Sequence, residues 1–179
     1  PRSTPKPSSA ASDVYKRQIE YAVHGVYSNT DASLLTLNRC IIRHNRDQGA
    51  HCWDGWIKIT DCTIEKNGCR GIVADHISSG TIQGNTIRGN GTDGIFCGVS
   101  SPDIIENIIE DNVDDGIECG WSSSPLIKGN IVSANKTHGI FVYESSHPRI
   151  IDNRVIGNGT SGINLRAFCT SAVSYTHLR

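Results

Sequence analysis

The chain has 179 residues, of which 37% are hydrophobic and 20% charged, and its formal net charge is −1. This composition is ordinary for one globular domain and excludes little, although no stretch approaches the ~20 apolar residues that a membrane span needs. Three features are more informative, namely 18 Gly, no Met and 7 Cys. They indicate many tight turns, a fragment that lacks its start, and no conventional disulfide framework.

The two ends of the chain differ from the rest. Segments 1–17 and 172–179 resemble translated sequencing-adapter read-through, so we expect residues 1–18 and 169–179 to lie outside the folded domain. Without the charges of these two segments the net charge falls to about −5. A mildly acidic domain disfavours nucleic acid as a partner, because binding to phosphates needs a basic face.

Residues 19–168 form a repeat with a period of roughly 23 residues. A Gly followed by a mostly apolar residue marks each unit and recurs in register, with the Gly at positions 25, 49, 71, 94, 116, 139 and 162. Each unit contains three short apolar segments that alternate with period two and are separated by Gly, Asn or Ser-Pro. We therefore predict three short strands in every unit.

One unit cannot bury its own apolar side chains, whereas a stack of units places equivalent residues above one another at the ~4.8 Å strand spacing. The stack predicts four inward columns. They are Leu37, Ile59, Ile82, Ile104, Ile127 and Ile150; Ile42, Ile64, Ile87, Ile109, Val132 and Val155; Val26, Ala50, Ile72, Ile95, Ile117, Ile140 and Ile163; and Ser28, Cys52, Ala74, Cys97, Cys119, Val142 and Leu165. The predicted fold class is therefore all-β, a right-handed single-stranded parallel β-helix of about six to seven coils.

The corners of the predicted coils carry Asn and Pro. Two Asn columns are expected where the chain turns, since Asn tolerates the left-handed conformation and its amide can bond its counterpart one coil away. They are Asn85, Asn107, Asn130 and Asn153, and Asn45, Asn67, Asn90, Asn112, Asn135 and Asn158. A leucine-rich repeat would instead show Leu at fixed sites and often a helical half, and these β-branched units do not.

The phrases SSPDIIENIIEDNVDDGIECG, from Ser100, and SSHPRIIDNRVIGNGTSGINL, from Ser145, resemble a known family. They are similar to the parallel β-helix repeats of the pectin-lyase-like superfamily, as in NosD-like periplasmic proteins, alginate epimerases and F-box proteins that carry a β-helix. The resemblance covers about residues 19 to 168 and concerns core and turn positions, so it implies a fold rather than a function. The superfamily includes lyases, hydrolases, epimerases and non-catalytic binders.

By this resemblance, the strand that starts at each Gly-Ile pair belongs to the sheet whose outer side forms the substrate groove in family enzymes. Alternation along that strand places aromatic and polar side chains outward. The predicted ligand-binding residues are Tyr27, His51, Trp53, Phe96, Trp121, Phe141, Tyr143 and Glu144. Aromatic rings stack on a pyranose while polar groups bond its hydroxyls, which favours a recognition surface over mere shielding of the sheet.

Asp93 and Asp115 occupy the same slot one coil apart, and Glu118 follows shortly after, so these three are the candidate catalytic residues. Stacked carboxylates repel unless they share a proton, bind a cation or point apart, so Ca²⁺ is expected only in an enzymatic case. The alternative is that Asp favours the turn before Gly and that solvent screens the pair. No Lys or Arg is expected to stack beside this cluster, and the Asp-Pro-His-Glu motif of alginate epimerases is absent. His138, in the same slot, is expected to pair with Asp115.

Inward cysteines such as Cys97 and Cys119 are interpreted as small apolar fillers. No ligand spacing for zinc is found, so no metal site and no cofactor are predicted. Buried, unpaired thiols fit a reducing compartment, which favours a cytoplasmic location over a secreted or periplasmic one.

The predicted function is non-catalytic recognition of an extended ligand, a polysaccharide or a protein segment, along one face of the β-helix. One version is the substrate-binding part of an F-box-type ubiquitin ligase. The alternative is a carbohydrate-active enzyme of the superfamily, a polysaccharide lyase, hydrolase or C5-epimerase. Since open strand edges present unpaired backbone groups to other chains, the fragment is also expected to associate end to end.

Overall fold

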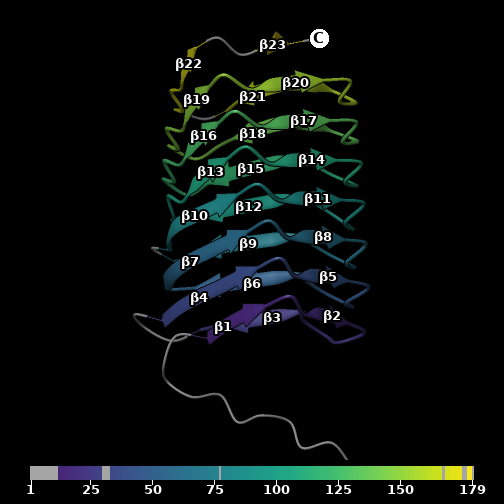
Figure 1. The fold of residues 1–179 in the computed structure, drawn as a ribbon. Helices are drawn as coiled ribbons and strands as arrows, with labels where there is room; N and C mark the ends of the chain where they lie inside the picture. Colours follow the sequence, from purple (N-terminus) through teal and green to yellow (C-terminus); the bar gives the residue numbers. More distant parts are fainter. Residues whose placement is uncertain (1–11, 30–32, 77, 167, 175–176, 179) are drawn as a thin grey trace, which may run out of the picture.

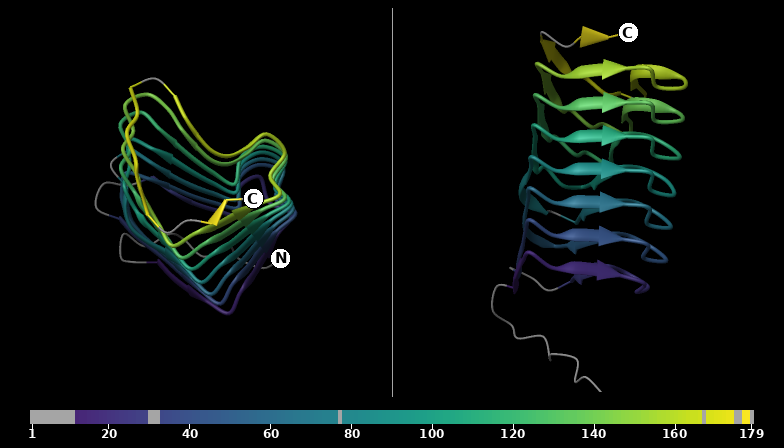
Figure 2. Two further views of the ribbon diagram at one scale, coloured as in Figure 1. Left: turned by 90° about the horizontal axis from the view of Figure 1, so that it is seen from above. Right: turned by 45° about the vertical axis from the view of Figure 1, so that its right-hand side comes forward.

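The computed structural model describes residues 12–29, 33–76, 78–166, 168–174 and 177–178. Within these ranges the chain forms strands and turns but no helix, and hence no helix that could cross a membrane. The strands wind into a stack of coils from β1 at one end to β23 at the other (Figure 1). Seen along the axis, successive coils superpose (Figure 2).

Three parallel sheets run the length of the stack, and each coil from β1 to β21 contributes one strand to each, while β22 and β23 extend two of the sheets. Sheet A contains β1 (Ser12–Tyr15), β4 (Ser33–Asn38), β7 (Gly55–Thr60), β10 (Ser79–Gln83), β13 (Asp103–Ile105), β16 (Leu126–Lys128), β19 (Arg149–Ile151) and β22 (Ala172–Ser174). Sheet B contains β2 (Gln18–Glu20), β5 (Ile41–Arg43), β8 (Thr63–Glu65), β11 (Thr86–Arg88), β14 (Ile108–Glu110), β17 (Ile131–Ser133), β20 (Arg154–Ile156) and β23 (His177–Leu178). Sheet C contains β3 (Val26–Ser28), β6 (Ala50–Trp53), β9 (Ile72–Asp75), β12 (Ile95–Gly98), β15 (Ile117–Gly120), β18 (His138–Val142) and β21 (Ser161–Leu165).

The strand register confirms the four predicted columns. Ile82 pairs with Ile59 and Ile104, and the pairing continues along each column in the same way. Cys97 lies directly opposite Cys119, and both thiols are fully buried as fillers of the core. The interior is therefore one continuous apolar core, packed with β-branched and other small apolar side chains.

The Asn columns hold the corners together. The side-chain oxygen of Asn107 accepts both the backbone N–H of Asn85, at 3.0 Å, and the side-chain amide of Asn85, at 2.9 Å. Backbone turns beside these columns adopt positive φ, for example at Asp61 (54°) and Glu106 (53°). Each buried Asn thus satisfies backbone donors that a sharp corner would otherwise leave without partners.

The Gly of each Gly-Ile pair is required by close approach between coils. A Cβ placed on Gly94 would lie 2.6 Å from the carbonyl oxygen of Gly116, 2.6 Å from Ile109 Cγ2 and 2.9 Å from the Asn112 amide. No larger side chain fits there without moving the backbone. The Gly that reveals the repeat in the sequence therefore brings neighbouring coils into contact where sheet C begins.

The stack extends beyond the expected boundaries of residues 19 and 168. Strand β1 pairs with β4, and β22 pairs with β19, in continuous parallel register. The reason is that the last strand of a sheet presents a row of backbone donors and acceptors, which an adjacent extended segment can pair. Parts of both terminal segments thus continue the sheets of the β-helix.

Candidate functional site

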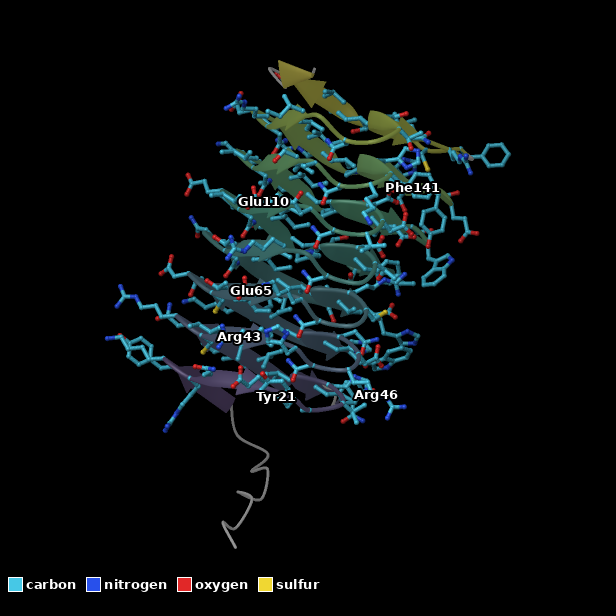
Figure 3. All side chains as sticks on the ribbon, turned by 90° about the vertical axis from the view of Figure 1, so that its right-hand side faces the viewer. Tyr21, Arg43, Arg46, Glu65, Glu110 and Phe141 are labelled. Atoms are coloured by element: carbon cyan, nitrogen blue, oxygen red, sulfur yellow. The ribbon has the colours of Figure 1, made fainter. Side chains whose placement is uncertain are left out.

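The candidate site lies on the outer side of sheet C, which we call the sheet C face. It consists of the outward side chains of the sheet C strands together with the residues directly before and after each strand. Figure 3 shows aromatic rings gathered along this edge of the stack, with Phe141 labelled among them. Because every coil adds one copy of each position, the face presents columns of side chains parallel to the solenoid axis.

The centre of the sheet C face is an arginine held between two acidic side chains. The Arg70 Nε atom lies 2.8 Å from Asp93 Oδ2, and its NH2 atom lies 3.2 Å from Glu118 Oε2. The expectation that no Lys or Arg lies beside the carboxylates was therefore wrong. Arg70 precedes Gly71 as Asp93 precedes Gly94, and its long side chain spans the coil between itself and Glu118.

Solvent screening does not explain this cluster, because Asp93 is 1% exposed and Asp115 is 4% exposed. Burial raises the pKa of the Glu118 carboxyl to about 8, and a hydrogen bond and the charge of Asp93 add to the rise. Glu118 therefore holds a proton at neutral pH that it can donate to Asp93. The two acidic groups coexist by sharing a proton and the charge of Arg70.

Tyr143 covers Glu118 from the next coil. Its hydroxyl hydrogen-bonds the Glu118 carboxyl, and burial together with Glu118 raises the pKa of Tyr143. The ring passes over Gly120, where an added Cβ would come within 2.6 Å of the ring carbons and the hydroxyl. Gly120 thus allows Tyr143 to fold back onto Glu118, and this glycine contributes to the shape of the site.

Asp115 pairs with His138 one coil further along, as predicted. The Asp115 Oδ1 atom lies 2.9 Å from His138 Nδ1 and accepts the backbone N–H of His138 at 2.8 Å. The Thr137 hydroxyl donates to the same oxygen. The other ring nitrogen of His138 lies 2.6 Å from the side-chain amide of Asn164, so the imidazole is held at both nitrogens.

The predicted aromatic ligand residues fall into two groups. In the carboxy-terminal half, Trp121 is 46% exposed and packs edge-on against Tyr143, which stacks on Phe141. Phe96 was expected to contact ligand but is 1% exposed, so its assignment to the contact surface is corrected. Arg70 lies over its ring at 4.0 Å, and the covered ring supports the guanidinium instead.

The second aromatic group lies in the amino-terminal half of the sheet C face. The ring of Tyr27, 48% exposed, meets His51 edge-on at 4.9 Å, and Trp53 stacks on His76 at 4.3 Å. Burial lowers the pKa of His51, and its Nε2 atom is buried without a hydrogen-bond partner among the described residues. The ring is therefore neutral and packs mainly as an aromatic surface.

Three carboxyl groups on this side of the stack could hold a cation. Oxygens of Asp93, Asp114 and Asp115 lie within 4.8 Å of one another. Asp93 already binds Arg70, and Asp115 already accepts hydrogen bonds from Thr137 and His138. The arrangement resembles a satisfied polar network more than an open set of hard oxygen ligands.

The family model described as the right handed beta helix region matches residues 48–177. The chain belongs to the right-handed β-helix family. No curated protein matches it.

Several solved structures resemble this β-helix. The A-module of the mannuronan C-5 epimerase AlgE4 of Azotobacter vinelandii has a TM-score of 0.72 and 14% identity, covering 93% of this chain and 55% of that one. A double mutant of the periplasmic alginate epimerase AlgG gives 0.68 and 16%, covering 92% and 46%. The AlgE6 A-module of the same Azotobacter gives 0.64 and 18%, covering 95% and 50%. The chain spans about half the length of these structures, and at such identities the likeness concerns the fold.

In this β-helix, the residues that follow the sheet C strands carry backbone strain. Val99, Trp121 and Glu144 have φ of 49°, 53° and 50°, in the left-handed region. The same conformation occurs in the turns after sheets A and B, for example at Asp61 and Lys66, and Val99 is unusual among these described residues because it is β-branched. Glu144, a predicted ligand residue, is exposed here beside Tyr143. The turn directs large side chains over the sheet C face.

Proposed function

We propose that the sheet C face binds a glycan chain lying parallel to the solenoid axis. The observation that carries the proposal is the row of half-exposed aromatic rings, including Trp121, Tyr143 and Phe141, beside the buried polar cluster of Arg70 and Glu118. Rings stack on the apolar faces of sugars, and the neighbouring carboxyl and hydroxyl groups bond their hydroxyls. The relatives of known structure are named for alginate and mannuronan, which supports a polysaccharide over a protein segment.

The shape of the β-helix also supports an extended ligand. The aromatic positions begin at Tyr27 in β3 and continue to Tyr143, which follows β18, with coils repeating at the ~4.8 Å strand spacing. A linear polymer can contact several coils at once, so many weak contacts add up along its length. No feature of the described residues favours a protein ligand or a ubiquitin-ligase context.

A second candidate is acid–base chemistry on the bound glycan, and the protonated Glu118 favours it. A carboxyl whose pKa is raised to about 8 keeps a proton at neutral pH and can act as a general acid. Tyr143 hydrogen-bonds Glu118, and Arg70 holds the carboxyl in place. Release of reducing ends or of unsaturated uronates by the chain, abolished in Glu118→Gln, would establish this activity.

The test of glycan binding compares two exposed tryptophans on different sheets. Trp121 follows β15 of sheet C and is 46% exposed, while Trp56 lies in β7 of sheet A and is 53% exposed. We expect the full chain to bind one or more polymers of a soluble polysaccharide panel in affinity electrophoresis. Trp121→Ala is expected to weaken that binding roughly tenfold, since a central aromatic contact contributes on the order of 1–2 kcal/mol.

The matched variant Trp56→Ala removes a similar exposed ring from sheet A. It should leave the affinity unchanged. Binding that is lost equally in both variants would place the ligand elsewhere, and the absence of binding to every polysaccharide would refute the proposal. Circular dichroism of both variants checks that the β-helix is intact.

A further inference from the structure

The fixed charges on the sheet C face are predominantly negative. From the second coil onward, the slot before each sheet C strand, the outward strand positions and the one or two residues after the strand carry six carboxyl groups and two guanidinium groups. The ionised carboxyl groups are Asp54, Asp75, Asp93, Asp115 and Glu144, the sixth carboxyl, Glu118, keeps its proton, and the guanidinium groups are Arg70 and Arg166. An anionic polymer along this face would meet more like charge than opposite charge.

Arg70 is already engaged by protein carboxyls. Its Nε bonds Asp93 and its Nη2 bonds Glu118, while its planar group lies over the Phe96 ring. A uronate carboxylate is recognised most strongly by two guanidinium nitrogens at once, and here it would have to compete with Asp93 and Glu118 for this side chain, which is 31% exposed. Capturing a uronate here would require breaking an ion pair with the buried Asp93.

Arg166 cannot replace it. This side chain lies 5.5 Å over the Phe141 ring, beyond β21 at the carboxy-terminal end of the face. One guanidinium serves at most one sugar, while the turns that follow the sheet C strands offer the accessible carboxylates of Asp54, Asp75 and Glu144. A negative charge 4 Å from such a carboxylate is disfavoured by about 4 kcal/mol at an effective dielectric of about 20.

The same groups suit hydroxyls. Glu144 offers exposed carboxylate oxygens, and Tyr143 with Glu118 offers a hydroxyl next to a carboxyl that keeps its proton at neutral pH. Sugar hydroxyls both donate and accept, so they can bond each of these groups without bringing a charge. Stacking on Trp121 requires no ligand charge either.

We propose that the glycan bound by the sheet C face is uncharged, built of sugars without carboxylate or sulfate groups. This inference rests on the proposed function and names the substrate class for the same face. It separates this chain from relatives whose names refer to alginate and mannuronan, although they share its fold.

The test measures affinity for three neutral polysaccharides, mixed-linkage β-glucan, galactomannan and xyloglucan, against two polyuronates, alginate and polygalacturonate. We expect at least one neutral polymer to bind, with polyuronates at least about tenfold weaker, a difference of about 1.4 kcal/mol. Affinity for the neutral polymer should not change when ionic strength rises from about 0.05 to 0.5 M, because no ionic contact is screened.

The possible outcomes separate the neutral class of the ligand from glycan binding itself. Tighter binding to a polyuronate, or to a cationic glucosamine polymer, would overturn the neutral class while leaving glycan binding intact. A steep loss of neutral-polymer affinity with salt would also overturn it. The absence of binding to every polymer would refute the proposed function itself.

A pair of charge variants sharpens the result. Asp114→Asn removes one exposed negative charge beside the sheet C face, while Glu110→Gln removes one on the outer side of sheet B. We expect Asp114→Asn to strengthen residual polyuronate binding severalfold and to leave neutral binding unchanged. Glu110→Gln should alter neither, and equal effects of both variants would show that overall charge, not the sheet C face, sets the preference.

Discussion

Sheets B and C are built by the same repeat, but the charged side chains on their outer faces are arranged differently. On sheet B, acidic and basic side chains alternate from coil to coil, and Arg43 lies 3.0 Å from Glu20 and 3.8 Å from Glu65. Arg88 continues the pattern at 2.9 Å from Glu65. Figure 3 shows Arg43, Glu65 and Glu110 one above another on this face.

The sheet C face breaks that alternation. Asp93 and Asp115 follow each other in the same slot, and Glu118 must keep a proton to lie beside them. The repeat can be satisfied with charges of opposite sign in successive coils, so the run of carboxyl groups on sheet C is a feature that stability alone does not require.

The largest expected effect is on the free energy of unfolding, and it should differ between variants of two arginines that both pair with acidic side chains. Arg70→Gln leaves the buried Asp93 without its cation, which should lower the free energy of unfolding by about 3 kcal/mol. Arg88→Gln removes a side chain that is 49% exposed, and its buried partner Glu65 keeps Arg43 at 3.8 Å, so this change should lower it by less than about 1 kcal/mol. Urea unfolding of both variants measures the difference, and equal losses would contradict the contrast between the two faces.

A second prediction concerns pH. The pKa of Glu118 rises from 4.5 to about 8 on folding, so the unfolded chain loses the proton first as pH increases. Stability of the wild type therefore falls between pH 4.5 and about 8 through this group, and the loss is complete above that range.

Glu118→Gln has no such proton to lose. Its free energy of unfolding, relative to wild type, should increase across this pH window by several kcal/mol, since one pKa unit corresponds to about 1.4 kcal/mol. Contributions that both proteins share cancel in the difference. A constant difference from pH 4.5 to 8 would mean that Glu118 is ionised in the folded chain.

The smallest expected effect on the free energy of unfolding comes from backbone strain at Val99. Val99 is 43% exposed and has a φ of 49°, a conformation that Asn adopts with less strain than a β-branched residue. Val99→Asn should raise the free energy of unfolding by about 1 kcal/mol. Val113 is 47% exposed and does not have positive φ, so Val113→Asn should bring no gain. Thermal unfolding checks both, and a loss at Val99 would refute the strain.

Most of the fold was predictable because the repeat fixes register. Once Gly71 and Gly94 are aligned, every intervening residue has a counterpart one coil away, and pairs such as Ile82 with Ile104 follow directly. The ends were less predictable, because segments such as Ser12–Tyr15 join a sheet through backbone hydrogen bonds that demand no particular side chain.

The site was predictable only in part. Alternation correctly placed Trp121, Tyr143 and Glu118 on the outer side of sheet C, and the shared slot correctly paired Asp115 with His138. It missed Arg70, although the same slot before Gly would have revealed it, because its contact with Glu118 skips a coil. The burial of Phe96 follows from that missed contact, since exposure depends on where long neighbouring side chains lie.

The Asn columns have a direction. Each side-chain amide donates towards the next coil, from Asn45 to Asn67 and onward to Asn158, so the amide dipoles align along the axis. The column therefore has a dipole along its axis, as an α-helix has, and the positive end of this dipole points towards the later coils. The β-helix therefore has a polarity of its own, and any further coil can join the column only in the head-to-tail orientation.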